Sequence, residues 1–123
     1  MERKMPARPR MRYRSRMSRI LLADADAFFV AVARKVDPEG AGRARLLIVG
    51  GRPGSRGVVC SASYETRAFG VRSAMPMSRA LRLCPGLIVV PGRHHLYSDM
   101  SRQVMERLGK LTPLVEQISI DEA

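Results

Sequence analysis

The chain has 123 residues, which is about the size of one domain and too short for a multidomain enzyme. Hydrophobic residues make up 46% of it, which excludes a wholly disordered chain, and no apolar run approaches the roughly 18 residues of a membrane helix. Two cysteines, Cys60 and Cys84, cannot build a disulfide framework, and without an apolar signal segment we expect a cytoplasmic protein with no membrane contact.

The positive charge is concentrated at the N-terminus. The net charge is +11, and residues 1–19 hold eight basic residues against one acid. Two prolines and the lack of an apolar period predict that residues 1–18 form a basic tail without fixed structure. Such a tail can bind a polyanion by counterion release, although a solvated extension is the simpler interpretation.

The first half of the ordered sequence alternates between strand and helix signals. Residues 20–23 are a short apolar run that predicts a buried central strand, and 27–36 have helical spacing. Two further apolar runs, 46–49 and 58–60, predict strands joined as a hairpin by the glycine-rich turn between them.

The second half adds three helices and two strands. The helices are predicted over 63–69, 76–83 and 94–111, and the last has apolar residues every three or four positions. The strands are predicted at 87–90 and at 114–120, where alternation indicates one buried face. This order of elements predicts an α/β fold (α+β with a mixed sheet).

Carboxylates follow two of the predicted strands. Asp24-x-Asp26 comes at the end of the first, and Asp121-Glu122 at the end of the last. If these strands lie side by side, the acids repel one another unless a cation lies between them, and oxygen ligands favour Mg²⁺. Two such ions can activate a hydroxyl and stabilise a leaving pyrophosphate. The simpler interpretation is that Asp24 caps a helix and that Asp121-Glu122 is a turn.

Two other pairs of side chains are candidates for ligand binding. Tyr64 and Arg67 are three residues apart near the start of a predicted short helix, so both can reach one anion there. Phe28-Phe29 follows the first carboxylates, so we expect one ring to face the core and the other to lie near whatever the carboxylates bind. The alternatives are that Arg67 is an ordinary surface residue with Tyr64 at the edge of the core, and that both phenylalanine rings belong to the core.

An apolar strand that ends in Asp-x-Asp is also how haloacid-dehalogenase-like phosphohydrolases begin. Phe28 stands where that class has a small or hydroxyl residue. Lys110 is the only lysine after Lys35, whereas the class needs a downstream lysine and a late acidic pair. The phosphohydrolase interpretation therefore stays as a weaker alternative.

Taken together, the motifs resemble those of the Y-family DNA polymerases of the DNA polymerase IV type. The resembling blocks lie in order at 24–29, 57–76, 87–97 and 119–123. Two departures are Ala33, where the family usually has an acid, and Thr66, where it has a small apolar residue. Four ordered blocks make this a far more specific signal than any single motif.

The resemblance implies the N-terminal part of a translesion polymerase that acts in DNA damage tolerance. Residues 19–35 and 93–123 would form part of the palm and 36–92 the fingers, with thumb and little finger absent. The implied partners are primer-template DNA and deoxynucleoside triphosphates, and a sliding-clamp peptide would lie beyond Ala123. We expect the chain alone to be poorly active, and a non-catalytic DNA-binding remnant is the second alternative.

The resemblance also assigns roles to individual residues. Asp24, Asp121 and Glu122 would be the catalytic carboxylates that hold two Mg²⁺ ions, with the backbone carbonyl of Ala25 completing one site and Asp26 in support. The residues implied in nucleotide binding are Phe28, Phe29, Ser61, Tyr64 and Arg67. Among them, Phe29 would be the steric gate that excludes the 2′-hydroxyl of ribonucleotides.

Overall fold

The computed structural model describes residues 19–123, so the predicted basic tail of residues 1–18 lies outside the described residues. The helices are α1 (Phe28–Val36), the 3₁₀ turn η1 (Ala41–Arg43), α2 (Tyr64–Arg67), α3 (Met77–Leu83) and α4 (His94–Leu111). The strands are β1 (Leu47–Gly50), β2 (Val59–Ala62) and β3 (Ile88–Val90). No helix in this part of the chain is long and apolar enough to cross a membrane.

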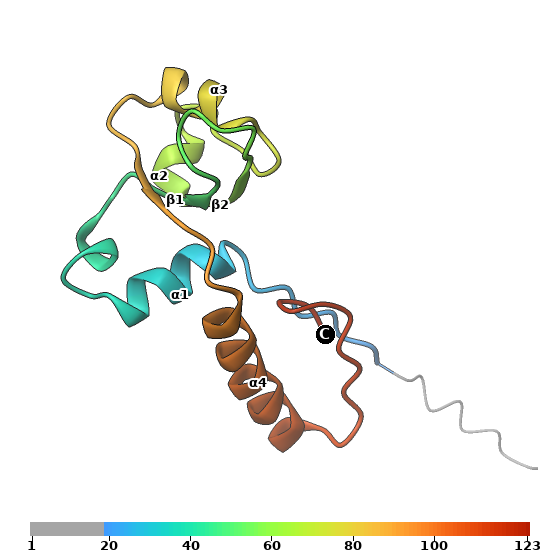
Figure 1. Cartoon of the computed structure of the whole chain (residues 1–123). Coiled ribbons are helices and arrows are strands. Elements are labelled where there is room, and N and C mark those ends of the chain that lie inside the picture. The colour runs from blue at the N-terminus through green and yellow to red at the C-terminus, as the bar shows by residue number, and fades with distance from the viewer. Residues whose placement is uncertain (1–18) are drawn as a thin grey trace, which may run out of the picture.

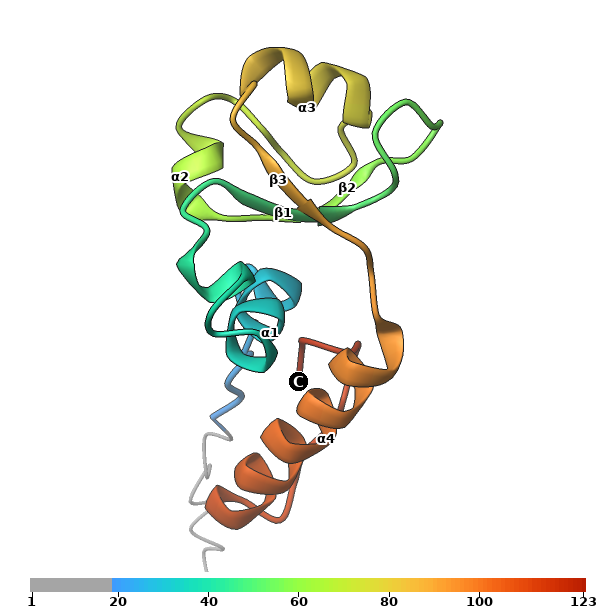
Figure 2. The same ribbon diagram turned by 60° about the vertical axis from the view of Figure 1, so that its left-hand side comes forward.

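The three strands form one mixed sheet in the order β2-β1-β3 (Figure 2). Strands β1 and β2 are antiparallel, which confirms the predicted hairpin, and β1 pairs with β3 in parallel. The hairpin closes tightly, because a Cβ at Gly51 would lie 2.6 Å from the Cα of Gly57. The mixed α/β fold expected from the order of elements is confirmed.

Side chains of the central strand β1 alternate between two hydrophobic clusters. Leu47 and Val49 face α1 and the buried Tyr97 of α4. Ile48 points to the other face, where Met77 and Ala80 of α3 pack against it. Both views show the same division, with α1 and α4 on one side of the sheet and α3 on the other (Figure 1, Figure 2). The sheet thereby fixes β2 and α1 side by side.

Two of the predicted strands do not form. Ile20 is 91% exposed and Leu114 is 88% exposed, and residues 20–23 and 114–120 contain no strand. A strand needs a neighbouring backbone, and within residues 19–123 these two segments are paired only over short stretches. Residues 23–25 pair with 121–123, and Ser119 forms an isolated bridge with Glu122. Backbone hydrogen bonds run from Ala23 N to Ala123 O (2.8 Å) and from Ala25 N to Asp121 O (2.9 Å). The apolar runs were therefore misinterpreted as complete strands.

Candidate active site

The short pairing of the two chain segments brings three carboxylates together. Asp24 and Glu122 face each other in an antiparallel bridge, and Asp121 precedes Glu122 in the turn. One carboxylate oxygen from each of the three lies within 4.8 Å of the others. The sequence predicted this meeting from strands at 20–23 and 114–120 lying side by side, whereas in the structure residues 23–25 pair with 121–123.

Helix α4 holds the turn that carries Asp121 and Glu122. The buried hydroxyl of Ser101 donates a hydrogen bond to the carbonyl of Ile120. Gln117 Nε2 donates to Ser101 Oγ (3.2 Å) and to the Ser119 carbonyl (3.0 Å). Ser119 Oγ in turn donates to Asp121 Oδ1 at 3.0 Å.

Sequence reasoning missed this support for the turn. A signal for it exists, because Ser101 follows Tyr97 by four residues and so lies on the apolar face of the predicted helix. A polar side chain in a buried position needs a hydrogen-bond partner, and the partner here is the carbonyl of Ile120, just before Asp121 and Glu122.

The start of α1 directs two aromatic rings to different places. Ala27 adopts a left-handed backbone (φ 49°) just before the helix, which turns the chain sharply after Asp26. Phe28 is buried in the core at 8% exposure. Phe29 stacks on Tyr97, with ring centroids 4.1 Å apart and planes 12° from parallel, and one side of it lines the pocket below. Phe28 is therefore the more buried ring and Phe29 the more exposed one, and both line the pocket.

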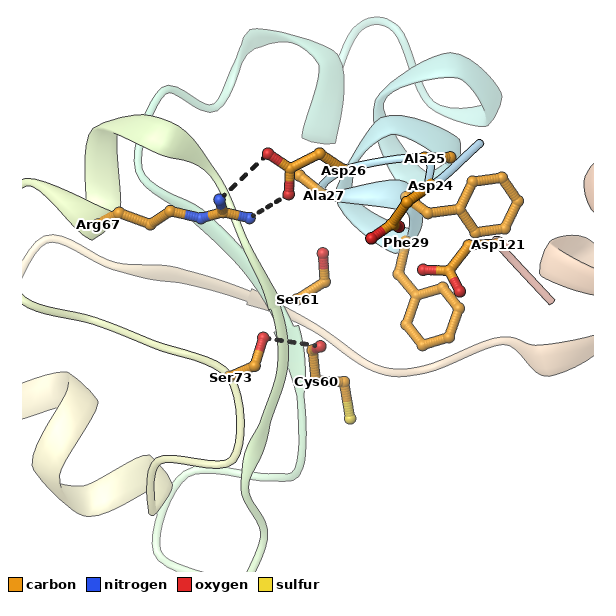
Figure 3. Close-up of a pocket in the computed structure, with 11 residues that line it drawn as sticks. Asp24, Ala25, Asp26, Ala27, Phe29, Cys60, Ser61, Arg67, Ser73 and Asp121 are labelled. Carbon is orange, nitrogen blue, oxygen red and sulfur yellow. Dashed lines mark hydrogen bonds and ion pairs between the residues drawn. The ribbon is translucent and has the colours of Figure 1, made fainter. Parts of the chain in front are cut away.

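Tyr64 and Arg67 lie on one face of α2, as predicted, and both contact Asp26. The Tyr64 hydroxyl donates to Asp26 Oδ2. Arg67 donates to both oxygens of the same carboxylate, at 3.4 Å through Nη1 and 3.1 Å through Nη2 (Figure 3). Ser63 caps α2 by accepting from Thr66 N. The anion held by this pair, the Tyr64–Arg67 clamp, is thus a side chain of the protein itself.

These contacts change the acidity of the groups that make them. The hydrogen bond from Tyr64 and then those from Arg67 lower the pKa of the Asp26 carboxyl from its usual value. The same hydrogen bond to Asp26 raises the pKa of the Tyr64 phenol. Asp26 is therefore anionic and Tyr64 protonated at neutral pH.

A pocket of about 160 Å³ joins the carboxylates to the clamp (Figure 3). Eight of the residues singled out from the sequence line it, namely Asp24, Ala25, Asp26, Phe28, Phe29, Ser61, Arg67 and Asp121. Ser61 is buried, and its hydroxyl oxygen accepts from Val30 N at 3.4 Å. Tyr64 and Glu122 do not line this pocket; each adjoins it through a residue that does, Asp26 and Asp121 respectively.

Sequence reasoning also missed two residues of the pocket wall. Cys60 of β2 and Ser73 line it, and Ser73 Oγ donates to the Cys60 carbonyl at 3.3 Å. Both lie in the resembling block 57–76, but neither was assigned a role there, and the packing of β2 beside α1 reveals them.

The donor set at the carboxylates suits a hard divalent cation. Three negative groups within 4.8 Å of one another repel unless a cation lies among them. All of the candidate ligands are oxygens, and no thiol or imidazole is among them, which favours Mg²⁺ over zinc.

Comparison with known proteins gives consistent matches. A sequence model of the impB/mucB/samB family matches residues 23–123. DNA polymerase IV of Vibrio parahaemolyticus is 46% identical to the chain over 108 residues, which are 88% of this chain and 30% of that protein. DNA polymerase IV of Shewanella baltica is 48% identical over 107 residues, 87% of this chain and 29% of that protein. The chain therefore spans about 30% of the length of the curated relatives it matches.

Solved structures agree with these relatives. The crystal structure of DinB from Sulfolobus solfataricus has a TM-score of 0.74 and 35% sequence identity, over 82% of this chain and 29% of that one. An insertion ternary complex of Dbh DNA polymerase has a TM-score of 0.72 and 35% identity, over 82% of this chain and 30% of that one.

Proposed function

The chain belongs to the impB/mucB/samB family, and on that premise we propose that it is the N-terminal catalytic part of a translesion DNA polymerase. The proposed reaction is the template-directed addition of deoxynucleotides to a DNA 3′ end, with primer-template DNA and deoxynucleoside triphosphates as substrates. The names of the relatives support this proposal.

The observation that carries the proposal is the convergence of Asp24, Asp121 and Glu122 beside a pocket that also contains Arg67. Phosphoryl transfer from a triphosphate needs positioned anionic ligands for cations and a positive group for the phosphates. Asp24, Asp121 and Arg67 line one cavity of about 160 Å³, although they come from chain segments far apart in the sequence.

We assign Asp24, Asp121 and Glu122 as ligands of two Mg²⁺ ions, with the Ala25 carbonyl as a further ligand. The ions would neutralise the developing phosphoryl charge and the leaving pyrophosphate. Tyr64 and Arg67 bind the triphosphate, the Ser61 hydroxyl borders it, and the exposed side of Phe29 meets the sugar. Phe28 supports Phe29 from the core.

The proposal includes a division of the chain into palm and fingers. Residues 19–35 and 93–123 would be palm, and 36–92 fingers. The carboxylate turn, α1 and α4 belong to the first set, whereas the three strands and α2 belong to the second. The pocket lies between the two sets, since Asp24 and Arg67 both line it.

Neither alternative from the sequence is favoured. The family and the similar structures are those of DNA polymerases, which leaves the phosphohydrolase without support. A non-catalytic DNA-binding remnant gives no reason for three carboxylates to remain within 4.8 Å of one another.

The test is primer extension by a chimera in which the chain is completed with the remainder of the Vibrio parahaemolyticus relative. We expect Mg²⁺-dependent incorporation that Asp24→Asn and Asp121→Asn abolish, because each removes an anionic ligand. Asp99→Asn is the matched control, since its carboxylate pairs with Arg102 on the surface of α4. Near-normal incorporation by Asp24→Asn or Asp121→Asn would refute the two-metal assignment.

A further inference from the structure

Asp26 already accepts hydrogen bonds from both residues of the proposed Tyr64–Arg67 clamp. A phenol has a single proton, and Tyr64 donates it to Asp26 Oδ2. Arg67 uses its Nε–H on the Ala62 carbonyl (3.1 Å) and one N–H from each terminal nitrogen on the Asp26 carboxylate. Tyr64 therefore cannot donate to a phosphate until it releases Asp26. Arg67 must divide its N–H donors between a phosphate and Asp26.

We propose that Asp26 is an internal counter-anion, which occupies the phosphate position of the Tyr64–Arg67 pair until a triphosphate displaces it. Nucleotide binding is then an exchange of one anion for another, and Asp26 lowers the affinity for triphosphate. This inference rests on the proposed function, because it takes the pair to be the triphosphate clamp.

The clamp does not depend on Asp26 for its position. Helix α2 is fixed by Ser63, whose hydroxyl oxygen accepts from Leu47 N and Thr66 N. The guanidinium of Arg67 is anchored at its base by the Ala62 carbonyl. Asp26 itself is the more exposed partner of the ion pair, at 57% against 30% for the Arg67 side chain. Removal of Asp26 should therefore free the clamp and leave its geometry intact.

Electrostatics act in the same direction. Asp24, Asp26 and Asp121 all line the pocket, whereas among residues 19–123 Arg67 is the one cationic side chain that does. Asp24 and Asp121 are the proposed cation ligands, but Asp26 has its contacts on the clamp side. Among these acids, Asp26 is therefore the one that opposes phosphate binding without contributing to the carboxylate cluster.

The experiment is calorimetric titration of the 123-residue chain with inorganic triphosphate in Mg²⁺, which probes the clamp without sugar or base. We expect Asp26→Asn and Asp26→Ala to tighten binding by about two- to tenfold, the range of an exposed charge-assisted contact. In a Tyr64→Phe background the gain should shrink, because the phenol proton no longer has to be exchanged.

The control for lost charge is Glu65→Gln. Glu65 is the neighbour of Tyr64 on α2 but faces Arg34, at 3.8 Å, instead of the clamp. Glu65→Gln should leave the affinity for triphosphate within twofold of that of the parent chain. If Asp26→Asn and Asp26→Ala leave the affinity unchanged or weaken it while the parent binds triphosphate, this inference alone is overturned. If no protein in the series binds triphosphate, the proposed function falls with it.

Discussion

Replacing each of the two adjacent phenylalanines by alanine should separate a core role from a site role. Phe28 is 8% exposed and belongs to the cluster that joins α1 to β1. Phe28→Ala should therefore lower the free energy of unfolding by about 3–5 kcal/mol, the usual cost of an aromatic ring lost from a core. The free energy of unfolding of an ordinary domain is about 5–15 kcal/mol, so this loss would be a large fraction of it.

Phe29→Ala should be milder for stability and stronger for substrate choice. Its ring is only partly buried, and the loss of the stack on Tyr97 plus part of its burial should cost about 1–2 kcal/mol. The ring lines the pocket, so a 2′-hydroxyl against it meets overlap and finds no hydrogen-bond partner. Without the ring, ribonucleotide incorporation should rise by about tenfold to hundredfold while deoxynucleotide use changes little.

The assays are urea denaturation of the 123-residue variants and parallel incorporation of both sugars by the completed chimera. If Phe28→Ala relaxes sugar choice and Phe29→Ala does not, the motif is misaligned by one residue. If neither variant relaxes it, the steric-gate assignment fails.

Three further changes test the clamp and its surroundings. Arg67→Ala should weaken triphosphate binding by about 10- to 150-fold in calorimetry, because it removes a charge-assisted phosphate contact, and an effect below twofold would make Arg67 an ordinary surface residue. Ser101→Ala should lower the free energy of unfolding by about 1–3 kcal/mol in urea, since it strips the Ile120 carbonyl of its donor; a neutral result would mean that α4 does not hold the carboxylate turn. The Tyr64 phenol should titrate above the ordinary value near 10, read at 295 nm as the difference from Tyr64→Phe. The stabilisation from the hydrogen bond of Tyr64 to Asp26 is fully present below the ordinary phenol pKa and is lost as pH rises through the raised pKa. Asp26→Asn should move the titration of the phenol back toward its ordinary value. An unmoved curve would show that the two side chains are not in contact.

Local patterns predicted most of the regular elements. The helical spacing at 27–36 and 94–111 corresponds to α1 and α4, and the three short apolar runs in the middle correspond to β1, β2 and β3 within two residues. Ile88 of β3 is 51% exposed and Leu111 of α4 is 83% exposed, whereas α1 and β1 are buried on the sides that their patterns indicate. Hydrophobic periodicity is enough in such cases because packing and pattern agree.

The failures are elements whose state depends on a distant neighbour. Residues 20–23 are as apolar as β1, but β1 has strands on both sides and 20–22 have none in the described chain. The hydrogen bonds from Tyr64 and Arg67 to Asp26 depend on the packing of α1 beside β2, which brings together residues 38 and 41 positions apart. A sequence shows that Asp26 is acidic, but not that its partner is the predicted phosphate clamp.

A metal-dependent triphosphate site can be tested by calorimetry. The 123-residue chain is titrated with a deoxynucleoside triphosphate, once with Mg²⁺ and once without it. We expect saturable binding that requires Mg²⁺ and disappears in Asp121→Asn, because that variant loses one of the anionic ligands that would hold the cation. Binding to DNA alone, sensitive to salt and indifferent to Mg²⁺, or release of inorganic phosphate from the nucleotide, would contradict it.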